Sequence, residues 1–260
     1  MDITWFDSNS WLLGLGGQQI LVDPWLQGEL VFGSQAWLFK GEHPQPRPLP
    51  ERVDLILLSQ GLPDHAHPPT LKALDRSIPV VGSPSAAKVA QQLGYTEVIA
   101  LSHGETFTFR ERVTIKAVVG APIGPTTVEN GYVLRDRQTG NSLFYEPHGF
   151  HAPELKAEAP VDVLITPVLD LALPLVGPII RGQRGALELV EWLRPQVLLP
   201  TADAAEVRYS GPLVALLKVL GSPEAFQTTL KAQGYSTRVV SPQVGQLLSL
   251  DLQAGSPPTR

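Results

Sequence analysis

A buried strand followed by a polar loop is the feature that most constrains the fold of this chain. Val53–Leu58 is apolar except for Asp54 near its start, a pattern typical of a strand buried on both faces. The loop that follows, residues 59–65, ends in Asp64 and His65, a carboxylate beside an imidazole. The chain therefore places groups with metal-binding or acid–base chemistry directly after an interior strand.

The remaining pattern is a β-rich half followed by an α/β half. Apolar stretches between turn residues predict strands at 3–6, 10–15, 19–22, 53–58, 79–82, 98–101, 106–110, 113–119, 131–135, 142–145, 161–166, 197–199, 238–240 and 246–250. Helical spacing and start signals predict helices at 69–74, 84–93, 185–193 and 223–233. We expect irregular chain at 26–50 and an apolar loop at 168–180. Two sheets packed face to face, with helices outside, would bury all of these elements.

Composition narrows the class of protein. With 260 residues, 43% of them hydrophobic and 17% charged, the chain can bury a full core, and we expect one domain over 1–252 and a disordered tail over 253–260. The net charge of −5, without runs of Lys or Arg, argues against nucleic acid as the main partner. The absence of cysteine excludes disulfides and thiolate metal sites. We read neither a signal peptide nor a transmembrane segment, so we expect a cytoplasmic protein of undetermined oligomeric state.

The loop after the buried strand resembles the metal-binding loop of the metallo-β-lactamase fold, which has the pattern His-x-His-x-Asp-His. Asp64 and His65 match its last two positions, whereas Gln60 and Leu62 stand where the family has its first two histidines. The resemblance covers nearly the whole chain. It implies an α/β (α+β) fold, a four-layer αββα sandwich of two mixed β-sheets with helices outside, and a metal cleft between the sheet edges.

Asp23, His148 and Asp203 fall near further landmarks of that family, in the expected order along the chain. Asp23 ends an early apolar strand and matches the aspartate that supports the metal loop, although an Asp-Pro turn is an alternative role. His148, two residues after Glu146, stands at the position of the family's bridging aspartate. Asp203 lies beside the position of the family's last histidine, which is Ala202 here.

The resemblance implies that the first of the family's two metal sites is lost. Zinc needs three or four nitrogen or oxygen ligands, and the family's first ion takes three imidazoles. Leu62 cannot ligate a metal, and the amide oxygen of Gln60 is a poor zinc ligand. The family's third histidine would fall within Gly120–Thr126, which contains none.

The second metal site keeps several imidazoles and carboxylates, namely Asp64, His65, His148 and either Asp203 or His151. These ligands suit one divalent ion, Zn²⁺, Fe²⁺ or Mn²⁺. His67, two residues beyond His65, is a spare ligand. Equally open is a site without metal, in which Asp64 bonds backbone N–H groups and His65 is a hydrogen-bonded structural residue.

The resemblance implies a hydrolase of a small-molecule ester, lactone or phosphodiester. A bound ion would lower the pKa of a water molecule towards ~7 and polarise the scissile group. Asp64 would orient that water or bind the ion, and His148 or Glu146 would donate a proton. One alternative is a non-catalytic protein that uses the cleft for ligand or partner binding. Another is a metal-free acid–base enzyme that uses Glu146, His148 and His65.

The apolar segment Val168–Ile180 has two interpretations. It is either a buried connection or dimer contact, or an apolar wall for a lipid-like or amphipathic substrate. In the second interpretation Trp25, Phe32 and Trp37 extend the wall. Arg181 and Arg184, just beyond the segment, would then meet an anionic head group, or they are solvated charges.

Overall fold

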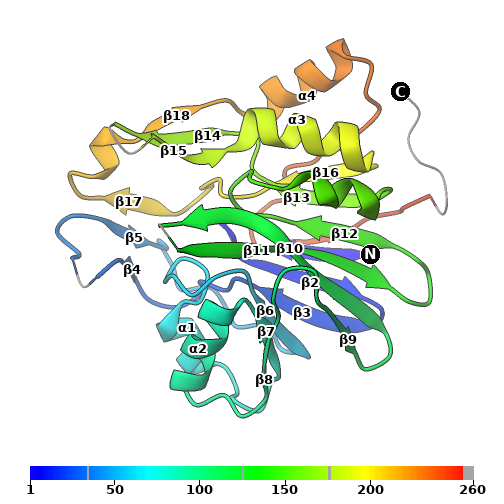
Figure 1. The fold of residues 1–260 in the computed structure, drawn as a ribbon. Coiled ribbons are helices and arrows are strands. Elements are labelled where there is room, and N and C mark those ends of the chain that lie inside the picture. The colour runs from blue at the N-terminus through cyan, green and yellow to red at the C-terminus, as the bar shows by residue number, and fades with distance from the viewer. Residues whose placement is uncertain (34, 125, 175–176, 254–260) are drawn as a thin grey trace.

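Two seven-stranded mixed sheets lie face to face in the computed structural model, as the sequence pattern predicts (Figure 1). The structure describes residues 1–33, 35–124, 126–174 and 177–253. Apart from Gln253, the predicted tail lies outside the described residues. Among the described residues, every helix is too short or too polar to span a membrane.

The first sheet has the strand order β20-β1-β2-β3-β6-β7-β8. Its strands are β1 (Asp2–Trp5), β2 (Trp11–Leu15), β3 (Gln18–Val22), β6 (Leu55–Leu58), β7 (Val80–Gly82), β8 (Val98–Ala100) and β20 (Leu247–Ser249). Strands β3, β6, β7 and β8 run parallel to one another. The carboxyl ends of β3 and β6 therefore lie side by side, which brings Asp23 next to the loop that begins at Ser59.

The second sheet has the strand order β19-β16-β13-β12-β11-β10-β9. Its strands are β9 (Thr106–Phe109), β10 (Val113–Ile123), β11 (Thr127–Asp136), β12 (Ser142–Tyr145), β13 (Val163–Thr166), β16 (Val197–Pro200) and β19 (Arg238–Val239). Strands β12, β13, β16 and β19 are parallel, so the loops after β12 and β16 open at one end of the sheet. Strands β10 and β11 are longer than predicted because their pairing continues across a register shift between Val119 and Pro122.

Helices cover the outer face of each sheet, which completes the four layers (Figure 1). The first sheet carries α1 (Pro68–Ala73) and α2 (Pro84–Gln92); the second carries α3 (Gly182–Leu193), α4 (Pro223–Ala232) and the 3-10 helix η1 (Pro153–Glu158). Ser83 and Ser222 cap α2 and α4 with their hydroxyls, and proline follows each cap, as the start signals predict. The four predicted helices are therefore confirmed.

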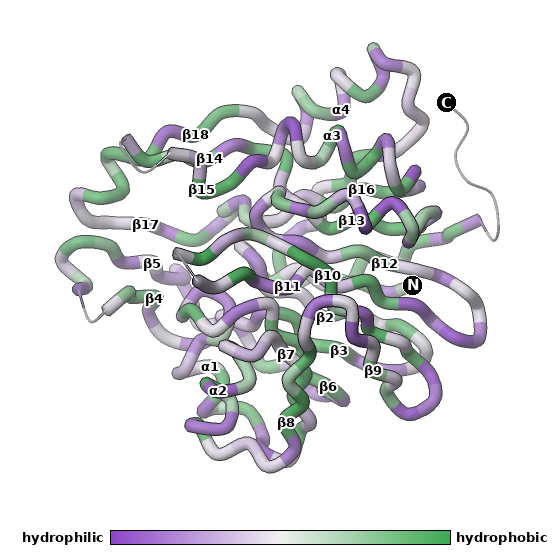
Figure 2. Tube along the Cα trace, viewed as in Figure 1, coloured by the Kyte–Doolittle hydropathy of each residue, from purple (hydrophilic) through white to green (hydrophobic). Residues whose placement is uncertain are grey.

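The core between the sheets comes from strand residues that alternate between buried and half-buried positions. In β2, Trp11, Leu13 and Leu15 are buried and face Tyr132 and Ile165 of the opposite sheet. Full burial of one such side chain contributes about 1.5–3 kcal/mol. The turns that end the β9–β10 and β11–β12 hairpins are hydrophilic, in contrast to the strands (Figure 2). The alternation of buried and half-buried residues along each strand determines which face of the strand points inward.

Short strands form where the sequence pattern predicts irregular chain. One small sheet joins β14 (Asp170–Leu173), β15 (Gly177–Arg181) and β18 (Lys218–Leu220), and the other joins β4 (Leu30–Val31), β5 (Lys40–Glu42) and β17 (Arg208–Ser210). The 3-10 helix η2 (Val214–Leu216) precedes β18. The predicted loop over 168–180 is thus a hairpin, although Leu175 and Val176 lie outside the described residues. The prediction failed because β14 and β18 are distant in sequence and Pro174, Gly177 and Pro178 hide the strand pattern.

Close backbone contacts lock the start of α3 onto the loop after β12. A Cβ atom on Gly185 would lie 2.5 Å from the carbonyl oxygen of Gly149, and one on Gly182 would lie 2.2 Å from that of Leu169. The backbone N–H of Arg181 donates to the carbonyl of His148 at 2.9 Å. Only glycine allows this approach, so α3 fixes the position of the His148 loop.

We expect Gly185→Ala to lower the free energy of unfolding by about 1–3 kcal/mol, because the added methyl group forces backbone apart. Glu191→Ala, on the exposed side of the same helix, is the control and should change it by less than about 0.5 kcal/mol. Urea unfolding followed by circular dichroism measures both variants. Equal stabilities of the two variants would show that the glycine contact is not tight.

Candidate metal centre

The loop after β6 turns once before α1 begins and presents two functional side chains. The backbone N–H groups of His65 and Ala66 both donate to the carbonyl of Leu62, at 3.0 and 2.8 Å. This single turn sets Asp64 and His65 side by side, with 3.2 Å between Oδ2 of Asp64 and Nε2 of His65. His65 is fully buried, and about a quarter of the Asp64 side chain is exposed.

Three hydrogen bonds to Asp23 hold the loop after β6, residues 59–65, in place, and a fourth joins Asp23 to Tyr145 of β12. Its Oδ1 accepts from the backbone N–H of Ser59 at 2.7 Å. Its Oδ2 accepts from the hydroxyls of Ser59 and Tyr145, at 2.5 and 2.6 Å, and lies 2.7 Å from Nδ1 of His65. Asp23 also has left-handed backbone, with φ of 42°, so it makes the chain turn as well. The two roles left open by the sequence coexist in this residue.

His65 is held by carboxylates on both ring nitrogens. Burial lowers the pKa of His65, but the Asp64 and Asp23 carboxylates outweigh burial and raise that pKa well above its ordinary value. Because Nδ1 faces Asp23, Nε2 is the nitrogen directed towards Asp64. A histidine fixed through Nδ1 by a buried carboxylate is typical of a metal ligand.

His148, in the loop after β12, is oriented in the same way by a different carboxylate. Its Nδ1 lies 2.8 and 3.0 Å from the two carboxylate oxygens of Glu129, a fully buried residue of β11. Burial lowers the pKa of His148, but the Glu129 carboxylate outweighs it and holds that pKa above its ordinary value. The bond to Glu129 leaves Nε2 as the free ring nitrogen.

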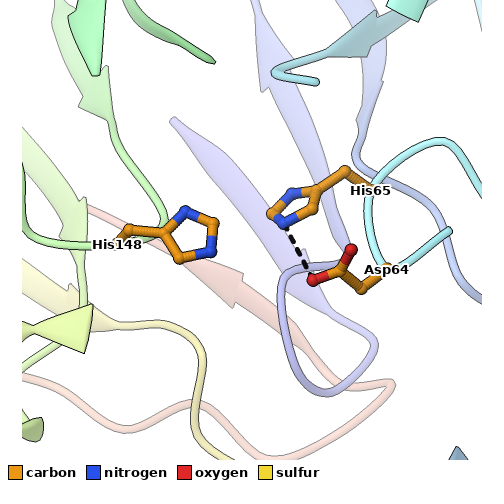
Figure 3. A group of neighbouring side chains, drawn as sticks. All are labelled: Asp64, His65 and His148. Carbon is orange, nitrogen blue, oxygen red and sulfur yellow. Dashed lines mark ion pairs between the residues drawn. The ribbon is translucent and has the colours of Figure 1, made fainter. Parts of the chain in front are cut away.

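Asp64, His65 and His148 point towards one another (Figure 3). Each offers one ligand atom, and these three atoms lie within 4.8 Å of one another. Oδ1 of Asp64 is buried and has no hydrogen-bond partner among the described residues, and Nε2 of His65 is buried with only the Asp64 ion pair at 3.2 Å beside it. Buried polar atoms normally have a partner. Two imidazoles and a carboxylate with an unpartnered oxygen fit a divalent cation.

Gln60, which stands at a histidine position of the family's loop pattern, forms a buried hydrogen-bonded pair with Glu129. Gln60, from the β6 loop, donates through Nε2 to Oε2 of Glu129 at 3.0 Å, and Oε1 of Glu129 accepts from the backbone N–H of Ala121. Leu62 is 41% exposed and points away from this pair's buried environment. Glu129 was not predicted from the sequence. It lies two residues before the predicted strand 131–135 and beside the polar Asn130, so it reads as part of a turn.

Glu146 is fully buried beneath the His148 loop. Its two carboxylate oxygens accept the backbone N–H groups of His148 and Gly149, at 2.8 and 2.5 Å. Burial, together with the neighbouring Glu129 carboxylate, raises the pKa of Glu146 to about 8. Glu146, Glu129 and His148 also place ligand atoms within 4.8 Å of one another.

The raised pKa values predict how the stability of metal-free protein depends on pH. Glu146, His65 and His148 have folded-state pKa values above their unfolded ones, so the folded state binds more protons. Their stabilisation is present at low pH and is lost as the pH rises through the folded-state values. Glu146 loses its contribution between its unfolded-state pKa of 4.5 and its folded-state value of about 8, and the two histidines lose theirs above 6.5, so we expect the free energy of unfolding to fall between about pH 6.5 and pH 8. Each group lowers it by about 1.4 kcal/mol per pH unit in this window. His67, whose pKa burial lowers to about 4, titrates below this window.

Urea unfolding of chelator-treated protein at several pH values measures this slope. Glu146→Gln removes one titrating group and should flatten the slope. A wild-type stability that stays constant or rises between these pH values would contradict the assignment.

Asp203, His67 and His151, which the sequence also suggests as ligands or neighbours, lie outside the group formed by Asp64, His65 and His148. Asp203 lines the same cavity as Asp64, but its Oδ1 accepts the N–H of Ala204 and it is not within the ligand group. His67 caps α1, with Nδ1 at Thr70 and Nε2 at the carbonyl of Glu29. His151 lies against Trp192, with Nε2 3.4 Å from Glu188, and faces another hollow.

A cavity of about 420 Å³ opens beside the ligands. Asp64 and His148 line it together with Leu171, Leu173 and Phe32, so the apolar segment does border the site. Trp25 and Trp37 do not line the cavity. Trp25 is fully buried against His43, and Trp37 is 70% exposed.

The two arginines predicted for an anionic head group line a separate hollow of about 770 Å³. Arg181 lies over the ring of Phe150 at 4.7 Å, and Arg184 pairs with Glu188 at 2.9 Å. The candidate ligands Asp64 and His148 line the other cavity, which shares Leu171 and Ile180 with this hollow but includes neither arginine.

Comparisons with known proteins identify the family. A model of the β-lactamase superfamily domain matches residues 2–202. A metal-dependent hydrolase from Halobacterium salinarum is 26% identical over 77% of this chain and 82% of its own length. A possible metal-dependent hydrolase from Veillonella parvula has a TM-score of 0.73 at 14% identity, covering 96% of this chain and 99% of that one. The isothiocyanate hydrolase from Delia radicum gut bacteria has a TM-score of 0.69 at 16% identity, covering 97% and 100%. The chain belongs to the β-lactamase superfamily, as its sequence resemblance implies.

Proposed function

We propose that this member of the β-lactamase superfamily is a metal-dependent hydrolase that holds one divalent ion between Asp64, His65 and His148. The observation that carries the proposal is the pair of carboxylate-anchored imidazoles. Asp23 fixes His65 and Glu129 fixes His148, each through Nδ1, so both Nε2 atoms are available beside the Asp64 carboxylate. This arrangement has the donors, the orientation and the supporting carboxylates of a metal site.

Two imidazoles and one carboxylate suit Zn²⁺, Fe²⁺ or Mn²⁺. When bound, such an ion lowers the pKa of a coordinated water towards ~7 and polarises a carbonyl or phosphoryl oxygen. Three protein ligands leave positions open for water and substrate. The proposed substrates are therefore those with a hydrolysable ester, lactone or phosphodiester group.

The surrounding residues have positioning roles in this proposal. Both oxygens of Glu146 accept backbone N–H groups, so Glu146 holds the His148 loop and does not reach the cavity. Asp64 has one buried oxygen without a protein partner and lines the cavity, so it can bind the ion and orient a water molecule. Burial raises the pKa of Asp64, but the His65 imidazole outweighs it and keeps that pKa low, which favours the carboxylate form.

One ion, not two, is proposed because the side-chain N–H of Gln60 is bonded to Glu129, although Oε1 of Gln60 has no hydrogen-bond partner among the described residues. An ion in the first position would need imidazoles that this chain lacks, and it would have to break the Gln60–Glu129 hydrogen bond. The same pair favours the second candidate function, a non-catalytic protein that uses the cleft only for binding. Retention of a complete three-ligand group favours the hydrolase.

Isothermal titration of chelator-treated protein with Zn²⁺ tests the proposal. We expect about one tight equivalent, and at least ~10-fold weaker binding in Asp64→Ala and His148→Ala because each removes a ligand. His151→Ala removes an imidazole outside the ligand group and should bind as the wild type does. Two equivalents, or unchanged affinity in both ligand variants, would refute the one-ion site.

A further inference from the structure

The cavity beside the metal ligands has a wall composition that limits the substrate. Its apolar residues come from both small sheets and from η2, with Leu171 and Ile179 on the β14–β15 hairpin, Leu217 and Val219 near β18, and Phe39 before β5. At about 420 Å³, the cavity is in the range of small-molecule sites. Asp64 and His148 line the same space, so a ligand in it reaches the proposed ion.

Apart from the proposed ion, the described lining residues of this cavity offer no cationic Lys or Arg side chain to hold an anionic substrate. Asp64 and Asp203 line it, and the other polar residues are Ser8, Asn9, His148 and Tyr209. Arg–phosphate and Lys–phosphate contacts are the usual means of holding a phosphodiester. Here the two nearby arginines, Arg181 and Arg184, line the other hollow.

We infer that the substrate is a neutral carboxylic ester or lactone with an apolar acyl chain, and not a phosphodiester. The inference rests on the proposed hydrolase function and narrows it. The apolar chain lies along the leucine-rich wall, and the ester carbonyl lies at Asp64 and His148. Hydrolysis forms a bond from the acyl carbon to a water oxygen and breaks the acyl–oxygen bond. The leaving alkoxide oxygen takes a proton, giving an alcohol and a carboxylic acid.

Chain length provides a quantitative test. Each methylene transferred from water to an apolar wall contributes about 0.8 kcal/mol, or roughly fourfold in affinity. Four additional methylenes should therefore tighten binding on the order of 100-fold. N-methylbutanamide and N-methyloctanamide, whose amide bonds resist hydrolysis far more than ester bonds do, are suitable neutral analogues. Isothermal titration of zinc-loaded and of chelator-treated protein would measure their affinities.

Variants in the wall show whether binding occurs in this cavity. Leu217→Arg places a charge in the wall and should weaken N-methyloctanamide binding at least ~10-fold. Leu216→Arg, on the adjacent residue, which is 54% exposed and outside the wall, is the matched control. Val219→Arg is a second wall variant at a position that is 57% exposed, so it should fold even if Leu217→Arg does not.

Hydrolysis of p-nitrophenyl butanoate, p-nitrophenyl octanoate and bis(p-nitrophenyl) phosphate provides a second readout. We expect kcat/KM to be highest for the octanoate and lowest for the phosphodiester. Equal affinity for the two amides in protein that binds zinc, or faster hydrolysis of the phosphodiester, would overturn the inference while leaving the metal site intact. Chain-length-dependent binding in a protein that binds no metal would support the assigned ligand class and refute the proposed hydrolase.

Discussion

The buried carboxylate of Asp23 is the interaction on which the rest of the site depends. It ends β3 of the first sheet, accepts the backbone and hydroxyl of Ser59 after β6, and accepts the hydroxyl of Tyr145 from the second sheet. A buried carboxylate without such partners would cost several kcal/mol. With them, Asp23 joins the two sheets at the open end of the sandwich and fixes the orientation of His65. Metal chemistry at this end therefore depends on a structural link between the sheets.

Glu129 orients His148 through Nδ1, as Asp23 orients His65 through Nδ1. It is buried, belongs to β11 and accepts hydrogen bonds from Gln60 and from the backbone of Ala121. One side chain thus bonds Gln60 of the loop after β6 and orients His148 of the loop after β12.

The sequence predicted those features that depend on local pattern. The burial of β6, the four helices, and the positions of Asp64 and His65 follow from short stretches of chain, and the αββα layers follow from the order of the elements. Glu129 was missed because its role depends on Gln60 and His148, which reach it from other parts of the chain. The β14–β15 hairpin was missed because Pro174, Gly177 and Pro178 interrupt its strand pattern, and β18, which also pairs with β14, lies more than 40 residues away in sequence. Side-chain convergence and strand pairing at long range leave little local signal.

The most direct test of the account is the location of the metal. Crystals of zinc-loaded protein, with anomalous diffraction collected at the zinc absorption edge, locate each bound ion independently of affinity or turnover. If one ion binds as proposed, we expect one peak, about 2.0–2.2 Å from Nε2 of His65, Nε2 of His148 and a carboxylate oxygen of Asp64. A second peak between Gln60 and Glu129, or a peak at ligands other than these three, would contradict it.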